Sequence, residues 1–166
     1  EFQGLVTKFP NRGNFVTKMT RDDVEDVYRI RAELESLAVR MLKERGKPDR
    51  EDSRRLSASL DRMERGARKG DFAMFSAGDL EFHRGLWDLA SSRSLRKAIE
   101  VVAVPQFSFV LIQSVRSSRL DLLRVVEDHR EWLKVLETRS TRQCVAHTRN
   151  ITDLFRRQIL EAWNET

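Results

Sequence analysis

The chain is poor in the residues that form disulfides, break helices or build membrane spans. Cys144 is the single cysteine in 166 residues, which excludes an intrachain disulfide and indicates a reducing compartment. Only 3 prolines and 7 glycines are present, and five of the glycines lie at or before position 70, so the second half has too few turn residues for a many-stranded sheet. The apolar stretch at 101–112 is interrupted by Pro105 and is too short to span a bilayer. We therefore expect a cytoplasmic protein without a membrane partner.

A helical pattern fills the chain from residue 20 to residue 166. Hydrophobic residues make up 40% and charged residues 34%, a balance typical of soluble globular proteins. Apolar residues recur at helical spacing in successive stretches, each beginning at a capping residue. The expected helices run from Thr20 or Asp22 to Gly46, from Pro48 and Asp49 to near Gly70, from Asp71 to the serines at 91–94, from about Leu95 to Val115, from Ser117 or Ser118, and from Ser140 or Thr141. Short links between them predict an all-α, antiparallel bundle of about six helices.

Residues 1–19 differ from the rest of the chain. Two β-prone runs, L-V-T-K-F and N-F-V-T-K-M, flank P-N-R-G, a pattern typical of a hairpin turn. A lone hairpin is marginal in water, so we expect it to belong to a larger unit and the sequence, which begins at Glu1, to be part of a longer protein. The net charge is +5, and Lys8, Arg12 and Lys18 concentrate positive charge here, which indicates a polyanion neighbour.

Three residues carry most of the chemistry in the sequence. Asp79 and His83 are four apart in D-L-E-F-H, so a helix places them on one face, one turn apart. His129 precedes Trp132 by three residues and Leu133 by four, which points its side chain toward the same buried face. A carboxylate and two imidazoles would form most of a site for a first-row metal. The alternatives are an ordinary Asp–His pair on a solvated helix and a histidine satisfied by hydrogen bonds in the core.

A catalytic function has less support in the sequence. No G-x-S-x-G, H-E-x-x-H or P-loop is present, and no nucleophile can be identified beside Asp79 and His83. Ligand capture suits this donor set better than turnover, so we expect a protein that is not an enzyme. A metal-dependent hydrolase built on a helical bundle remains an alternative, as does a purely structural dimerisation module.

Four segments together resemble a known family. These are G-L-V-T-K-F-P-N-R-G-N-F-V, the R-x-x-L-E pattern at Arg31 to Glu35, D-L-E-F-H, and E-D-H-R-E-W-L-K-V-L. In this order they resemble the C-terminal effector-binding (FCD) domain of the FadR branch of GntR-type bacterial transcription regulators. The first segment resembles the wing hairpin of the family's winged-helix DNA-binding domain. The resemblance implies two parts, an incomplete wing at 1–19 and a helical effector-binding and dimerisation domain at 20–166.

The resemblance also implies a metal, zinc or nickel, held by one acid and three histidines. Asp79, His83 and His129 match three of these ligands. The fourth lies in the last helix, where a register with Ala146, Ile151 and Leu154 on the core face places Asn150 at the ligand position. His147, one turn earlier, is the alternative, and a bound ligand or water is another.

The function that the resemblance implies is a homodimeric regulator that binds operator DNA and senses a small carboxylate through the metal. Arg31 has two interpretations, an ion pair with Glu35 four residues on or a guanidinium that binds the effector's carboxylate. Lys8, Arg12 and Lys18 would contact phosphate from the wing. A metal-free effector domain of the same fold is the main alternative.

Overall fold

Six helices form the bulk of the molecule, as the sequence predicts. The computed structural model describes the backbone of residues 6–9, 13–16, 19–117 and 121–163, and the side chains of residues 19–107, 109 and 121–161. The helices are α1 (Arg21–Arg45), α2 (Arg50–Lys69), α3 (Phe72–Leu89), α4 (Arg93–Ser117), α5 (Leu122–Thr138) and α6 (Thr141–Trp163). Helix α4 continues through Pro105. Among the described residues, none of these helices has the length and apolar character needed to cross a membrane.

Short polar side chains define where the helices begin. The Thr20 hydroxyl accepts a hydrogen bond from the Asp23 backbone N–H, and the Asp23 carboxylate accepts one from the Thr20 backbone, so both satisfy groups that the helix itself leaves open. Asp49 and Asp71 cap α2 and α3 as predicted. The predicted cap of α5 is wrong. Ser117 ends α4, and α5 begins after Asp121, whose carboxylate accepts the Arg124 N–H at 3.0 Å.

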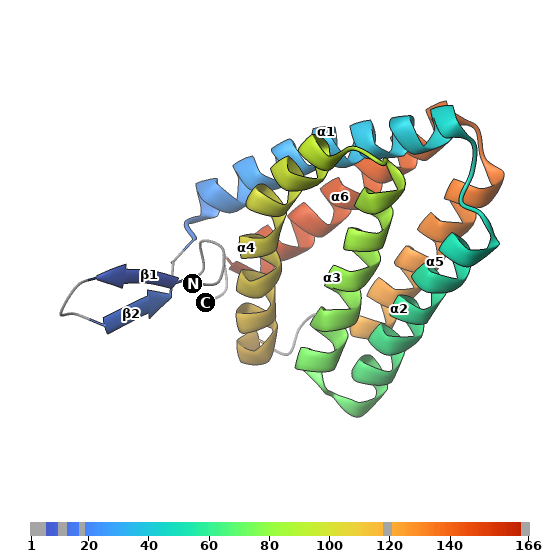
Figure 1. The fold of residues 1–166 in the computed structure, drawn as a ribbon. Helices are drawn as coiled ribbons and strands as arrows, with labels where there is room; N and C mark the ends of the chain where they lie inside the picture. The colour runs from blue at the N-terminus through green and yellow to red at the C-terminus, as the bar shows by residue number, and fades with distance from the viewer. Residues whose placement is uncertain (1–5, 10–12, 17–18, 118–120, 164–166) are drawn as a thin grey trace.

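Two short strands precede the helices. β1 (Val6–Phe9) and β2 (Gly13–Val16) pair antiparallel, with Val6 opposite Val16 and Phe9 opposite Gly13. Figure 1 shows this pair at the N-terminal end of α1. Lys8 lies in β1, whereas Arg12 and Lys18 lie outside the described residues.

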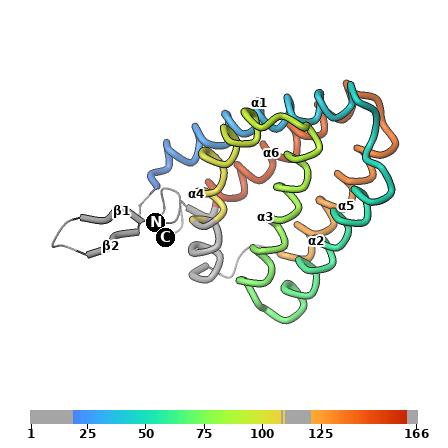
Figure 2. Tube along the Cα trace, in the orientation of Figure 1, coloured from blue at the N-terminus to red at the C-terminus, as the bar shows by residue number. Residues whose placement is uncertain are grey.

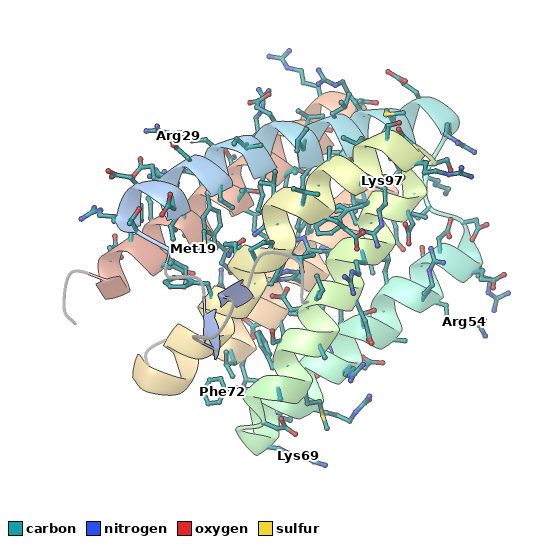
Figure 3. All side chains as sticks on the ribbon, turned by 60° about the vertical axis from the view of Figure 1, so that its left-hand side comes forward. Met19, Arg29, Arg54, Lys69, Phe72 and Lys97 are labelled. Atoms are coloured by element: carbon teal, nitrogen blue, oxygen red, sulfur yellow. The ribbon has the colours of Figure 1, made fainter. Side chains whose placement is uncertain are left out.

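The helices pack around two groups of buried apolar side chains. α1 packs against α6, α4 and α3, while α2 packs against α3 and α5 (Figures 1 and 2). The larger group fills the space between most of the helices and includes Phe82, Trp87 and Trp132. The smaller group joins Val24 and Tyr28 near the start of α1 to Leu160 near the end of α6. Figure 3 shows charged side chains such as Arg29 and Arg54 on the outside of the bundle.

Candidate metal centre

The structure brings Asp79, His83 and His129 to one point inside the bundle. Asp79 and His83 come from adjacent turns of α3, and His129 comes from α5. The Nε2 atoms of the two histidines lie 3.3 Å apart. Asp79 Oδ1 lies 3.6 Å from His83 Nε2 and 3.2 Å from His129 Nε2. The predicted convergence is therefore present, and these side chains form a group that could hold a metal ion.

The spacing of these three atoms matches the ligand shell of a small transition metal. Bonds of about 2.1 Å in a tetrahedral site separate neighbouring ligand atoms by about 3.4 Å. The observed separations of 3.2, 3.3 and 3.6 Å lie around that value. One carboxylate oxygen and two imidazole nitrogens are also a donor set that zinc and nickel accept.

Hydrogen bonding directs the lone pairs of the site toward one another. The His129 Nδ1 atom lies 2.8 Å from the Val125 carbonyl, so it donates its proton there and leaves Nε2 with a lone pair. Asp79 Oδ1 is buried and accepts no hydrogen bond within the described part of the chain. A buried oxygen without a donor costs free energy, and a cation between the three atoms would remove that cost.

Burial and charge favour the protonation states of the Asp79 carboxylate and the His83 imidazole that a metal requires. Burial lowers the pKa of His83, which favours the neutral imidazole. Burial alone would raise the pKa of Asp79, but the contact with His129 and the charges of neighbouring groups outweigh it and lower the pKa. Both shifts favour the forms that bind a cation, an ionised carboxylate and a neutral imidazole.

A second layer of buried polar groups surrounds the histidines. Glu35 is fully buried, and its Oε1 accepts hydrogen bonds from Arg31 Nη2 at 3.0 Å and Trp87 Nε1 at 3.2 Å. The same oxygen lies 3.3 Å from His83 Nδ1. Although burial opposes its ionisation, the charge of Arg31 and the contacts with His83 lower the pKa of Glu35 to about 2. A carboxylate behind a ligating histidine fixes the orientation of the ring and strengthens it as a ligand.

Gln106 extends this layer to α4. Its side-chain nitrogen donates to the Tyr28 hydroxyl at 2.8 Å, and its oxygen accepts a hydrogen bond from Arg31. Sequence reasoning did not identify Glu35 as a partner of His83, nor did it identify Gln106 or Tyr28. The R-x-x-L-E pattern was a signal for Glu35, but Gln106 lies 75 residues from Arg31 and 78 from Tyr28, and nothing in its local pattern marks it.

The three candidate ligands open into a cavity of about 60 Å³. Five of the six helices contribute to its walls. Its polar lining residues are Asp79, His83, His129, Arg31, Gln106, Tyr28 and Ser76, and its apolar ones are Phe72, Phe75, Phe107, Leu122, Val125, Phe155 and Ile159. Arg31 therefore fits both of its predicted interpretations, because it pairs with Glu35 and also lines the cavity.

Neither predicted fourth ligand reaches the cavity. Asn150 is exposed and His147 is half-buried, and neither lines the cavity, to which α6 contributes Phe155 and Ile159. The predicted register of α6 is wrong in part, because Ala146 is exposed and Leu154 is 40% exposed. The core face of α6 instead carries Cys144, Thr148, Ile151 and Thr152.

Comparisons with proteins of known structure match the fold at low sequence identity. E. coli McbR/YncC superposes with a TM-score of 0.78 at 17% identity, over 98% of this chain and 78% of that one. A GntR family transcriptional regulator from Pseudomonas syringae pv. tomato DC3000 superposes with a TM-score of 0.75 at 19% identity, over 98% of this chain and 65% of that one. A proposed transcriptional regulator GntR from Rhodococcus sp. RHA1 superposes with a TM-score of 0.75 at 20% identity, over 96% of this chain and 74% of that one.

Comparison at the level of sequence gives the family. No curated protein sequence matched this chain. The family model of the FCD domain matches residues 26–154, a span that contains Asp79, His83, His129 and the polar layer around them. Because this match covers most of the sequence, the chain belongs to the FCD domain family.

Proposed function

We propose that this chain is the ligand-sensing part of a DNA-binding transcription regulator, and that it captures a small carboxylate with the help of a divalent transition metal, zinc or nickel. The observation that carries the proposal is the set of three donor atoms, 3.2–3.6 Å apart, at the wall of a cavity that Arg31 also lines. A metal and a guanidinium in one cavity are the two groups that bind a carboxylate most strongly.

Asp79, His83 and His129 would hold the metal. When bound, it would supply a Lewis-acidic position for a carboxylate oxygen, since three protein ligands leave coordination positions open. Phe155 and Ile159, which α6 presents to the cavity, carry no donor atoms, so the remaining positions fall to the ligand and to water. Glu35 holds His83 in place from behind, and Val125 does the same for His129.

A sensing role also fits the place of the cavity in the fold. Tyr28 and Ile159 belong to or pack against the small apolar group at the start of α1, Phe75, Phe107 and Val125 belong to the larger one, and Phe155 packs against both. A ligand in the cavity therefore touches both groups at once. Its binding would favour one arrangement of α1 relative to the other helices, provided that its affinity differs between the two arrangements.

Helix α1 follows directly after the β1–β2 pair. We propose that residues 1–19 are the end of a winged-helix domain, with Lys8, Arg12 and Lys18 near DNA phosphates, and that residues 20–166 form the sensing and dimerisation domain of a cytoplasmic homodimer. Movement of α1 would then change how two DNA-binding domains sit on an operator. The fold is shared with structures described as transcriptional regulators, which supports regulation rather than catalysis.

Elemental analysis tests the metal. Protein purified without chelator or metal-affinity tag should carry close to one equivalent of zinc or nickel. His83→Ala removes a ligand and should lose that metal while the helical circular dichroism remains. If the protein binds no metal after exposure to an excess of either ion, the proposal is wrong and a metal-free effector domain takes its place.

A further inference from the structure

We propose that the cavity selects short acids that carry a single negative charge and an apolar tail, and that Glu35 sets this limit by neutralising Arg31. The inference rests on the proposed function, because it takes the metal at Asp79, His83 and His129 as given. It goes further by naming the chemical class of the ligand and the residue that excludes doubly charged acids.

The charge of the site limits how many carboxylates it can hold. Among the described residues at the cavity and its buried second layer, Asp79 and Glu35 are negative and Arg31 is positive, while histidines that bind a metal are neutral. These groups leave one negative charge, so the site without a metal repels a carboxylate. A divalent cation reverses the balance to one positive charge. One carboxylate then neutralises the site, and a second would be buried without a counter-charge, which is costly.

Arg31 already has partners within the protein. Its terminal nitrogens donate to Glu35 at 3.0 Å and to Gln106, and the guanidinium lies over the Phe107 ring at 4.6 Å from the ring centre. Nε is buried and has no acceptor in the described part of the chain. The edge of the guanidinium that carries Nη1 and Nη2 is therefore taken up by the protein, so Arg31 does not present the two-pronged fork with which a free arginine grips a second carboxylate.

The size and lining of the cavity favour a short acid with an apolar tail. One water needs on the order of 10–15 Å³ of such space, so about 60 Å³ is the room of roughly four to six waters and admits only a short acid. Half of the side chains that line the cavity are apolar, among them Phe72, Leu122 and Ile159. An alkyl tail gains by burial there, whereas a hydroxyl or a second carboxylate would lose its hydrogen bonds to water.

A panel of four acids tests this selectivity on the zinc-loaded full chain by titration calorimetry at constant ionic strength. Succinate, succinamate and hexanoate have equal numbers of non-hydrogen atoms, and butyrate is a shorter acid of the same kind as hexanoate. Succinamate differs from succinate by one charge and should bind about tenfold tighter or more. Hexanoate should bind at least as tightly as succinamate, and butyrate should bind. Protein stripped with chelator should bind none of them.

Glu35→Gln should reduce the preference for succinamate over succinate by about tenfold, because it leaves one positive charge free for the second carboxylate. Glu33→Gln is the matched control. It removes the same charge from an exposed acid of the same helix, paired with Arg149, and should leave the preference unchanged.

The outcomes separate the two proposals. If the wild-type chain binds succinate as tightly as succinamate, the charge limit is wrong while the metal-dependent capture of carboxylates stands. If a chain with stoichiometric zinc binds none of the four acids, both are wrong. The wild-type panel decides the question even if Glu35→Gln does not fold.

Discussion

At the scale of single residues, Trp132 shows how the candidate site is supported from outside. Its indole is almost fully buried and lies edge-on to His83, with 5.5 Å between ring centres. Its Nε1 donates a hydrogen bond to the Thr148 hydroxyl at 3.1 Å. This bond ties α6 to α5 beside the histidines.

We predict that Thr148→Val destabilises the chain by about 1–3 kcal/mol, because it leaves the buried indole N–H without an acceptor. Thr152→Val is the control. Thr152 is also buried and its hydroxyl also donates to the carbonyl four residues earlier, at 2.8 Å, but it receives no bond from Trp132. Urea unfolding of the two variants measures the difference, and equal losses would show that the Trp132 bond is not what stabilises this contact.

The histidines give a second prediction at this scale. His129→Ala should abolish the bound metal, because it removes one of the three donor atoms that meet at the cavity. His147→Ala should keep it, since His147 does not line the cavity. The metal content of the two variants, purified side by side, shows which of the two histidines binds the metal. Loss of metal in His147→Ala would mean that α6 turns in solution to supply the fourth ligand.

At the scale of the helices, glycine sets how closely α2 and α3 approach. A Cβ added at Gly78 would lie 2.8 Å from the Met63 backbone nitrogen and 2.9 Å from the Ser59 carbonyl oxygen. Because these are backbone atoms, the two helices could not both keep their positions. Gly78 immediately precedes Asp79, so the same close contact between α2 and α3 also fixes the position of this candidate metal ligand.

We therefore expect Gly78→Ala to lower stability by about 1–3 kcal/mol through overpacking and to weaken metal binding by shifting Asp79. Gly85→Ala on the same helix is the control, since its Cβ would meet the end of the Leu56 side chain, at 2.7 Å from Cδ2, which can rotate away. Thermal unfolding and zinc titration of both variants test this. Equal effects of the two substitutions would contradict the account.

The helices also show what local sequence can and cannot predict. Asp49 and Asp71 were found as caps because a cap needs only its own carboxylate and the next turn. The start of α5 was missed because Ser117 and Asp121 are both residue types that cap helices, and the local sequence does not choose between them. The register of α6 was misjudged because Thr148 and Thr152 are polar by type. Each becomes acceptable in the core by donating its hydroxyl to the carbonyl four residues earlier.

At the scale of the whole molecule, the site depends on contacts between distant parts of the chain. The spacing of Asp79 and His83 predicted their common face, and the apolar face of α5 predicted that His129 points inward. The layer behind them could not be predicted in the same way. Trp87 is 52 residues from Glu35, and Gln106 is 75 residues from Arg31, and such pairs follow from how the helices pack rather than from any periodicity.

Since the ligands come from two helices of one cooperative core, metal binding should stabilise the fold as a whole. Zinc at one hundred times its dissociation constant adds about 2.7 kcal/mol to the free energy of unfolding. For a chain of 166 residues this corresponds to a rise in Tm of about 5–10 °C.

Asp79→Asn keeps the shape of the side chain but removes its charge, so it should lose most of the rise in Tm, whereas His147→Ala should retain it. Calorimetric scans with and without zinc measure the shift. A rise of equal size in Asp79→Asn would place the metal elsewhere on the chain and leave Asp79 as an ordinary partner of His129.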